Sequence, residues 1–386
     1  MNKNNSFIIL GSTGSIGVQA IDVAKQNGIY VEALSAHKNI NMIEKQARML
    51  SVKACAMADE SAAKELKIKL ADTNIRVYIG ESGICEMIAN SNSKTVLNSI
   101  VGQAGLMPTL QTIESKKKLA LANKESLVVA GEIVMANAKK NEVPIIPVDS
   151  EHCAIHQCLN CGRKNEIKKL ILTASGGPFY NKTSDMLKDV TKQDVLSHPT
   201  WNMGAKITVD SATLMNKGFE VIEAMHLFDV NSDKIDVVVH PESIIHSMVE
   251  YIDNSIIAQM SSPDMRFCIQ YALFYPQRAN AVSSNLNLAQ VGKLTFGYPD
   301  FDTFSLLSSA FHAAKLGGAL PAVLNAANEV AVSKFLSGNI KFRDITNIVN
   351  EVFYSMESAK NIHTLDEILL TDKMTREITE KMILSK

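Results

Sequence analysis

The sequence Phe7-Ile-Ile-Leu-Gly-Ser-Thr-Gly-Ser-Ile-Gly17 places three glycines directly after a short apolar run. The apolar run is typical of a buried strand, and a helix is expected to begin at Ser15 or Ile16. Gly11 allows a tight turn, Gly14 lets the backbone approach a pyrophosphate, and Gly17 lets helix and strand pack closely. Free N–H groups at the helix N-terminus would face the phosphates. The stretch therefore predicts the opening of a dinucleotide-binding domain.

The glycine spacing is one residue longer than the stricter dinucleotide fingerprint, and a purely structural glycine-rich turn is the alternative. The surrounding sequence favours the binding loop, because short apolar runs alternate with helical stretches up to residue 148. These runs are Phe7–Leu10, Tyr30–Ser35, Lys53–Met57, Arg76–Ile79, Thr95–Ile100, Leu119–Ala122 and Ile145–Val148. Such alternation predicts an α/β domain over residues 1–148, with a Rossmann-like, doubly wound parallel sheet.

The rest of the chain divides into three further parts. Residues 149–280 mix apolar runs with long loops rich in Gly, Pro, Ser and His, which predicts a central α+β catalytic domain. Residues 281–303 are typical of a linker, and residues 304–386 predict a helical bundle. The expected strands of the central domain are Ile167–Thr173, Lys206–Val209, Ile235–His240, Ser247–Tyr251 and Ile256–Gln259. The expected helices of the bundle are Phe304–Leu316, Pro321–Leu336, Phe342–Met356 and Leu365–Leu384.

The composition excludes several classes of protein. In 386 residues, 39 Lys and Arg balance 40 Asp and Glu, and the formal net charge of −1 argues against nucleic acid as a partner. The apolar runs fall short of the roughly 20 residues that a membrane-spanning helix needs. The early apolar run is too short for a signal peptide, and the six cysteines show no disulfide framework. We therefore expect a cytoplasmic protein with reduced thiols.

The end of the second expected strand indicates which dinucleotide would bind. In NAD-binding domains a carboxylate at this point accepts a hydrogen bond from the ribose 2′-OH. Here the strand leads into Ala36-His37-Lys38-Asn39, which has no acidic residue. A cation and an amide suit a 2′-phosphate, so the sequence favours NADP. The alternative is that Lys38 is simply solvated.

Three carboxylates could form a metal site. Asp149 and Glu151 follow a buried-looking strand, and two residues apart in extended chain they would point to the same side. Glu220 lies in a helix expected to run from Asp210 through Phe228. Hard divalent ions such as Mg²⁺ prefer these oxygen ligands. The alternatives are a solvated turn with a capping Asp149 and an ordinary surface helix.

Around Glu220 the expected helix places an amide and a cation on the same side. Asn216 is four residues before Glu220 and Lys217 is three residues before it, so both share its face. Such a cluster could serve a phosphate and a metal together. Gly218 within the helix costs about 1 kcal/mol relative to Ala, and a plain surface helix leaves that cost unexplained.

Two further segments are candidates for substrate contacts. Lys124 follows the sixth expected strand, at the edge where ligands bind in open α/β sheets. Ser175-Gly-Gly177 and the segment from His198 to Gly204, with the only tryptophan, Trp201, could bound a lid that closes over an anion. Two ordinary surface loops are the alternative.

Seven motifs together resemble the 1-deoxy-D-xylulose 5-phosphate reductoisomerase family, in the family's order. They are Gly11-Ser-Thr-Gly-Ser-Ile-Gly17, Leu121-Ala-Asn-Lys-Glu-Ser-Leu127, Pro147-Val-Asp-Ser-Glu-His152, Ser175-Gly-Gly-Pro-Phe179, His198-Pro-Thr-Trp-Asn-Met-Gly204, Val209-Asp-Ser-Ala-Thr-Leu-Met-Asn-Lys-Gly218 and His240-Pro-Glu-Ser-Ile-Ile-His246. The resemblance spans the chain and extends to Leu324-Asn-Ala-Ala-Asn-Glu329.

The resemblance implies a function in the non-mevalonate isoprenoid pathway. 1-Deoxy-D-xylulose 5-phosphate (DXP) is rearranged to a branched aldehyde phosphate, and NADPH reduces this to 2-C-methyl-D-erythritol 4-phosphate. A divalent ion, Mg²⁺, Mn²⁺ or Co²⁺, acts as Lewis acid. The resemblance also suggests a homodimer. Whether the rearrangement is an α-ketol shift or a retro-aldol/aldol sequence stays open.

The resemblance also assigns roles residue by residue. Metal ligands are Asp149, Glu151 and Glu220, which form the catalytic group together with Lys124. Substrate contacts are Lys124, Ser150, Glu151, Ser175, His198, Trp201, Ser211, Asn216, Lys217, Glu220 and His246. Cofactor contacts are Gly11, Thr13, Gly14, Ser15, Ile16, Gly17, His37, Lys38, Asn39, Asn123, Glu125, Met203 and Gly204, and Trp201 and Met203 belong to the lid. His37 departs from the family pattern, which has a small residue there.

Two other functions are compatible with the residues alone. One is a metal-assisted NADP oxidoreductase that reduces a phosphorylated sugar without rearranging it. The other is a nucleotide-sensing module without chemistry, which would need no carboxylate triad. Product analysis separates the first from a reductoisomerase, and metal titration separates the second.

Overall fold

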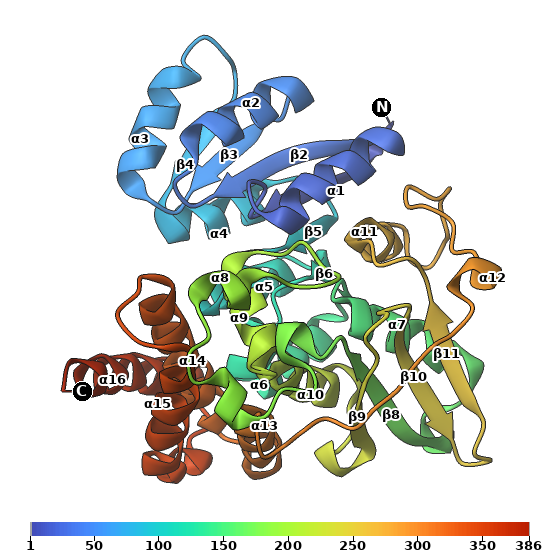
Figure 1. Ribbon diagram of the computed structural model, residues 1–386. Coiled ribbons are helices and arrows are strands. Elements are labelled where there is room, and N and C mark those ends of the chain that lie inside the picture. The colour runs from blue at the N-terminus through green and yellow to red at the C-terminus, as the bar shows by residue number, and fades with distance from the viewer. Residues whose placement is uncertain (1, 386) are drawn as a thin grey trace. The chain divides into compact units, whose positions relative to one another are not determined.

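The computed structural model describes residues 2–385, which form two compact units (Figure 1). The first unit contains the chain up to residue 126, together with residues 134–153 and 264–284. The second unit contains residues 127–133 and 154–263 and the chain from residue 285 onward. Among residues 2–385, no helix combines the length and the apolar character that crossing a membrane requires.

The first unit is built on a parallel sheet of seven strands. The strand order is β4-β3-β2-β1-β5-β6-β7, and every neighbouring pair is parallel. The strands are β1 (Asn2–Leu10), β2 (Ile29–Ala36), β3 (Ala54–Met57), β4 (Arg76–Ile79), β5 (Thr95–Asn98), β6 (Lys118–Leu121) and β7 (Ile145–Pro147). The doubly wound sheet predicted from the sequence is confirmed.

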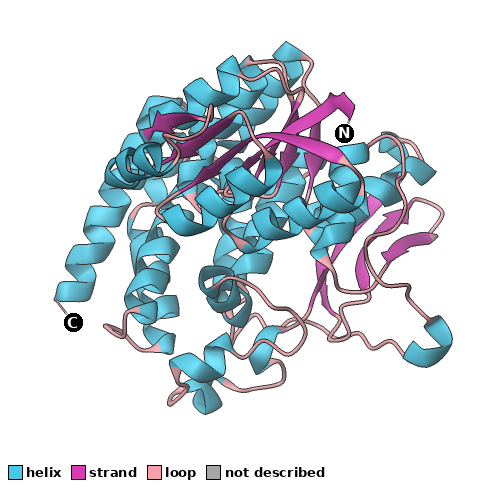
Figure 2. Ribbon diagram, turned by 90° about the horizontal axis from the view of Figure 1, so that it is seen from above, coloured by secondary structure: helices cyan, strands magenta, loops and turns pink. Residues whose placement is uncertain are grey.

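Helices connect and cover these strands, as the cyan and magenta ribbons of Figure 2 show. They are α1 (Ser15–Gln26), α2 (Ile40–Leu50), α3 (Glu60–Lys69), α4 (Gly80–Asn90), α5 (Leu106–Glu114) and α11 (Met265–Phe274). The chain passes between the two units within α6 (Glu125–Asn141) and α7 (Ser150–Cys158). The second half of β1, Phe7–Leu10, is buried on both faces. Phe7 and Ile9 belong to one apolar cluster, and Ile8 and Leu10 belong to another. Burial on both faces explains why Phe7–Leu10 is a continuous apolar run.

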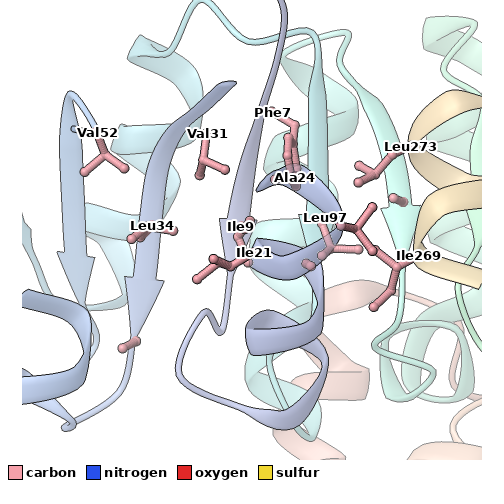
Figure 3. Packing of buried hydrophobic residues seen from close by; sticks show 14 of the residues in the cluster. Phe7, Ile9, Ile21, Ala24, Val31, Leu34, Val52, Leu97, Ile269 and Leu273 are labelled. Carbon is pink, nitrogen blue, oxygen red and sulfur yellow. The ribbon is translucent and has the colours of Figure 1, made fainter. Parts of the chain in front are cut away.

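Helix α11 joins the first unit although it follows the central domain in sequence. It packs against α1, and Ile269 and Leu273 are buried in the cluster that contains Phe7 and Ile9 (Figure 3). The expected domain boundary at residue 148 leaves this helix in the catalytic domain. Its own apolar side instead completes the cover of the parallel sheet.

The second unit contains a mixed sheet of four strands in the order β11-β10-β8-β9. Only the β8–β9 pair is parallel within this sheet. The strands are β8 (Ile167–Ala174), β9 (Ile235–Val239), β10 (Ile245–Tyr251) and β11 (Ile256–Met260). The predicted mixture of strands and long loops is confirmed.

Helices make up the rest of the second unit. They are α8 (Lys192–Leu196), α9 (Ala205–Ala212), α10 (Met215–Phe228) and the short α12 (Leu288–Val291), followed by α13 (Ser305–Leu316), α14 (Leu320–Leu336), α15 (Phe342–Ser355) and α16 (Leu365–Leu384). The last four pack on one another as the predicted helical bundle. Thr364 caps α16 by accepting a hydrogen bond from the Glu367 N–H.

Two expectations about the segment before Glu220 are wrong. Lys206–Val209 is not a strand but part of α9, where the Thr208 hydroxyl bonds to the Gly204 carbonyl one helical turn back. The predicted helix from Asp210 through Phe228 is instead two helices. Leu214 breaks it with a left-handed backbone (φ 57°), and α10 begins at Met215.

Candidate active site

The glycine loop between β1 and α1 has the geometry that an anion site needs. Gly11 has a φ of +78°, and a Cβ there would lie 2.7 Å from the Ser99 carbonyl oxygen. A Cβ on Gly17 would lie 2.4 Å from the Gly11 oxygen. Packing within the unit therefore requires both glycines. At Gly14 the nearest atom would be 3.4 Å away, so this glycine leaves room at the α1 N-terminus, where a phosphate can approach the N–H groups.

The loop after β2 carries the residues expected beside a 2′-phosphate. Lys38 is largely exposed, and its ammonium lies 3.6 Å from an Asp59 carboxylate oxygen. Asn39 caps α2, because its side chain accepts a hydrogen bond from the Met42 N–H at 3.2 Å. His37 is exposed beside them.

Sequence reasoning missed Asp59, which follows the neighbouring strand β3 and caps α3. Hydrogen bonds from Ser61 and the Ala62 N–H, with the charge of Lys38, lower the pKa of Asp59 to about 2. Residues that follow the carboxyl end of a strand in an open parallel sheet lie near the ligand-binding edge, and Asp59 is the second residue after β3.

Asn123 after β6 is buried and holds the loop that follows β5. Its amide donates hydrogen bonds to the carbonyls of Ile100 (2.7 Å) and Gly102 (2.9 Å) and to Glu125 (3.1 Å). A Cβ on Gly105 would collide with the Asn123 side chain at 2.4 Å. The Asn123 amide is therefore committed to shaping the edge of the sheet.

Lys124 and Asp149 form a mostly buried ion pair. Their side chains are 7% and 14% exposed, and the charged atoms lie 2.5 Å apart. Strands β6 and β7 are parallel neighbours, so the two residues after them share one edge of the sheet. Pairing lets both charges persist away from water.

Glu151 belongs to the first turn of α7 rather than to extended chain. The Asp149 carbonyl already accepts a helical hydrogen bond from the Cys153 N–H. Asp149 and Glu151 are therefore not in extended chain, and strand alternation does not set the directions of their carboxylates. A helix N-terminus stabilises them instead, because its partial positive charge favours anions. Ser150 donates its hydroxyl hydrogen to Glu151 at 2.5 Å.

Helix α10 in the second unit carries the third carboxylate. Glu220 is 0% exposed, and it contacts the ammonium of Lys217 and the amide of Asn216 on the same helix face. The predicted shared face is confirmed. A carboxylate buried this completely needs cationic or hydrogen-bonding partners, and both neighbours supply them.

Gly218 has a packing role that the sequence left unexplained. Helix α10 packs on α13, and a Cβ on Gly218 would lie 2.5 Å from the Ala310 Cβ. The glycine therefore allows the two helices to approach closely. Lys217 and Glu220 occupy other positions of the same helical turn.

Ser175 and His198 form a hydrogen-bonded pair, with 3.0 Å between the Ser175 Oγ and the His198 Nε2. The His198 Nδ1 accepts hydrogen bonds from the N–H groups of Thr200 (3.2 Å) and Trp201 (2.9 Å). Burial lowers the pKa of His198, which favours the neutral ring. The ring hydrogen therefore sits on Nε2 and is donated to Ser175.

This arrangement makes Ser175 a hydrogen-bond donor. Its oxygen accepts from His198 and from the Gly177 N–H at 3.2 Å, which uses both lone pairs. The hydroxyl hydrogen is then directed to a third partner, and an anionic oxygen suits it. Gly177 has a φ of +64°, and a Cβ there would lie 2.9 Å from the Ser211 carbonyl oxygen, so the loop lies against α9.

Trp201 lies beside His246, with 6.1 Å between the ring centroids. The His246 Nε2 is 2.8 Å from the Ser261 hydroxyl. Met203 is half-buried, and Gly204 precedes α9 as its N-cap residue.

The predicted site residues thus fall into two groups, one in each unit. The first unit holds Gly11, Thr13, Gly14, Ser15, Ile16, Gly17, His37, Lys38, Asn39, Asn123, Lys124, Glu125, Asp149, Ser150 and Glu151. The second holds Ser175, His198, Trp201, Met203, Gly204, Ser211, Asn216, Lys217, Glu220 and His246.

Three family models match the chain. They are described as 1-deoxy-D-xylulose 5-phosphate reductoisomerase (residues 7–131), 1-deoxy-D-xylulose 5-phosphate reductoisomerase C-terminal domain (145–228) and DXP reductoisomerase C-terminal domain (260–378). Among curated proteins, the reductoisomerase of Acetivibrio thermocellus is 50% identical over 98% of this chain and 99% of that protein. That of Caldanaerobacter subterraneus is 51% identical over 96% of this chain and 97% of that protein.

Solved structures give the same result. A DOX-P reductoisomerase in complex with NADPH, fosmidomycin and magnesium has a TM-score of 0.92 and 38% identity, covering 98% of both chains. The 1-deoxy-D-xylulose 5-phosphate reductoisomerase of Zymomonas mobilis, in complex with NADPH, has a TM-score of 0.91 and 38% identity, covering 99% of this chain and 100% of that one. The chain belongs to the 1-deoxy-D-xylulose 5-phosphate reductoisomerase family.

Proposed function

We propose that this protein converts DXP to 2-C-methyl-D-erythritol 4-phosphate, with NADPH as reductant and a divalent metal ion as cofactor. The observation that carries the proposal is the 50% identity to a curated reductoisomerase over 98% of the chain. Both units supply the residue types that such a reaction needs at the ends of their elements.

Asp149, Glu151 and Glu220 are the proposed metal ligands. Each offers a carboxylate oxygen, the ligand that Mg²⁺ and Mn²⁺ prefer. A bound ion would polarise the substrate's carbonyl and adjacent hydroxyl as a Lewis acid. Two of these carboxylates contact a lysine, Asp149 with Lys124 and Glu220 with Lys217.

The substrate phosphate would be held by residues of the second unit. Lys217 supplies charge, and Ser175 supplies a hydroxyl hydrogen that His198 and Gly177 leave free for an anion. Ser211 and Asn216 lie on α9 and α10 and would add neutral hydrogen bonds. A neutral His198 suits this role, because it orients Ser175 without adding a charge of its own.

Lys124, Ser150, Trp201 and His246 would contact the sugar itself. Lys124 would stabilise negative charge that develops on a substrate oxygen. Trp201 lies in the segment from Gly176 to Gly204, which would close as a lid. Closure would keep the reactive aldehyde away from water until hydride transfer.

NADPH would bind the first unit at the α1 N-terminus. The N–H groups from Thr13 to Ile16 would hold the pyrophosphate, and His37, Lys38 and Asn39 would lie by the 2′-phosphate. Further contacts would come from Asn123 and Glu125 and, in the second unit, from Met203 and Gly204. We expect Asn123 to act mainly by shaping the loop after β5, since its amide is already committed.

We further propose a cytoplasmic homodimer. The six cysteines are free, which suits a reducing compartment. Strand β11 is at the edge of the mixed sheet, with a row of backbone groups that a second copy could pair. Light scattering of the purified protein would measure the oligomeric state.

The function is tested by following NADPH oxidation with DXP as substrate. We expect turnover that depends on DXP, stops when EDTA removes divalent ions, and returns when Mn²⁺ or Mg²⁺ is added in excess. Turnover that is insensitive to EDTA would contradict the metal-dependent reaction.

A further inference from the structure

Gln46 on helix α2 is a polar side chain on the inward face of the helix. It is 5% exposed, and its neighbours on that face, Ile43 and Ala47, are fully buried. An apolar residue would suit such a position. A buried amide costs free energy unless its polar atoms are paired, so the partners of Gln46 explain its presence.

Both ends of the Gln46 amide pair with one residue of the glycine loop. The Ser12 hydroxyl donates to the Gln46 Oε1 at 2.8 Å, and the Gln46 Nε2 donates to the Ser12 carbonyl at 2.9 Å. Ser12 is 0% exposed and lies between Gly11 and Thr13. Two bonds from one planar group fix both the position and the orientation of the peptide that leads to Thr13.

Strand β2 holds the other side of the same loop. The Ser12 N–H donates to the Ser35 carbonyl at 2.8 Å, and the Gly11 N–H donates to the Ser35 hydroxyl at 3.2 Å. These bonds tie the loop to the strand that ends near Lys38. The loop is therefore held between β2 and α2.

Helix α2 also begins at the proposed 2′-phosphate site. Asn39 is its N-cap residue and Lys38 precedes it. Gln46 is seven residues further along, about 10 Å at 1.5 Å per residue. Helix α2 therefore connects the proposed 2′-phosphate residues, which directly precede it, to Gln46 and the glycine loop.

We propose that Gln46 is a positioning residue for NADPH, which couples the pyrophosphate loop to the 2′-phosphate site. The inference rests on the proposed use of NADPH by this chain. Gln46 fixes the distance between the pyrophosphate site and the 2′-phosphate site, so both sites are preorganised for NADPH. NADH has no 2′-phosphate, so its affinity depends on the pyrophosphate site alone. Loss of the amide therefore weakens NADPH more than NADH.

The test uses equilibrium binding and needs no turnover. The fluorescence of NADPH and of NADH is titrated with the wild-type protein and with Gln46→Met, which keeps the length of the side chain and removes both hydrogen bonds. We expect the Kd for NADPH to rise about ten-fold, the effect of one to two neutral hydrogen bonds, and the Kd for NADH to rise less. The KM for DXP, measured at saturating NADPH, stays within about two-fold because the substrate residues proposed here lie elsewhere.

Gln270→Met is the matched control. Gln270 is also a buried amide of the first unit, on α11, and it donates a hydrogen bond to the Asn280 carbonyl. Its loss lowers thermal stability without changing the ratio of the two Kd values. Ser12→Ala removes one of the two hydrogen bonds to Gln46. We expect it to raise the Kd for NADPH less than Gln46→Met does, and it replaces Gln46→Met in the test if Gln46→Met does not fold.

The double variant separates a direct partnership from general destabilisation. If Ser12 and Gln46 act through each other, their effects on the Kd for NADPH are less than additive. Additive effects, or an unchanged NADPH to NADH ratio in Gln46→Met and Ser12→Ala, would overturn the role of Gln46. A wild-type protein that does not bind NADPH would count against the proposed function itself.

Discussion

The ammonium of Lys124 lies 2.5 Å from a carboxylate oxygen of Asp149, and the pair joins the ends of strands β6 and β7. Lys217 contacts Glu220 in the same way on α10. Two of the three proposed metal ligands thus have a lysine beside them. A metal ion held by these carboxylates would lie close to both ammonium groups, whose positive charges would oppose its own.

Replacing Glu220 by Gln tests the metal assignment. The substitution keeps the shape of the side chain and the contact with Asn216 but removes the charge. We expect kcat to fall by on the order of 100-fold, equivalent to about 3 kcal/mol of lost metal-assisted stabilisation. The Kd for NADPH should be nearly unchanged, since the proposed cofactor loop belongs to the other unit.

The control for Glu220→Gln is Glu377→Gln, which makes the same change at an exposed position of α16. Both variants are assayed over a range of Mn²⁺ concentrations. Turnover of Glu220→Gln equal to that of the wild type at saturating Mn²⁺ would show that Glu220 does not bind the metal.

Replacing Lys38 by Asp should reduce the preference for NADPH over NADH. The wild-type protein should prefer NADPH strongly, because β2 ends without a carboxylate. The carboxylate introduced by Lys38→Asp would repel a 2′-phosphate, and it would offer an acceptor to a 2′-OH. The measurement is kcat/KM for both cofactors. Lys45→Asp makes the same charge change at an exposed position within α2 and should leave the ratio near the wild-type value. Equal kcat/KM for the two cofactors in the wild type would contradict the proposal.

Trp201 should report closure of the lid. It is the only tryptophan, so emission comes from one site beside His246. Saturation with a phosphonate hydroxamate such as fosmidomycin should shift the emission and protect residues 176–204 from proteolysis. Unchanged emission together with unchanged proteolysis would identify Trp201 as a static residue.

Lys217→Ala should weaken the same inhibitor by about 1.5–3 kcal/mol, the usual value of a hydrogen bond to a charged group. Trp201→Phe should keep the fold and lose part of the enclosure, because the smaller ring covers less of the ligand. Inhibitor binding by Lys217→Ala at wild-type strength would place the phosphonate elsewhere.

Gly218→Ala should destabilise the protein although alanine favours a helix. The gain in helix propensity is about 1 kcal/mol, whereas overpacking costs about 1–3 kcal/mol. The new Cβ would lie 2.5 Å from the Ala310 Cβ. The cost of overpacking should therefore exceed the gain in helix propensity, and the free energy of unfolding should fall. Adding Ala310→Gly should restore part of the loss. A more stable Gly218→Ala would mean that α10 and α13 can move apart freely.

The sequence predicts the elements whose signals are local. Short apolar runs predict the seven parallel strands. The glycine loop predicts the start of α1, and the Thr364 cap predicts the start of α16. Lys206–Val209 predicts a strand because Ile, Thr and Val suit strands. In the structure α9 packs against α8, α10 and α14, and these contacts outweigh the local propensity.

Features that depend on distant residues escape sequence reasoning. Gln46 is unremarkable until Ser12 is seen to pair with it. The need for glycine at position 218 is explained only by its contact with Ala310, which lies far along the sequence on another helix. The motifs predict which residues form the site, but they do not reveal that Ser175 is left as a hydrogen-bond donor, since that follows from four hydrogen bonds and the burial of His198.

The most direct test of the account is the identity of the product formed from DXP and NADPH in the presence of Mn²⁺. NMR distinguishes a rearranged carbon skeleton from a sugar that has only been reduced. We expect 2-C-methyl-D-erythritol 4-phosphate as the product, in an amount equal to the NADPH consumed. Consumption of NADPH that yields an unbranched reduced sugar phosphate would contradict it.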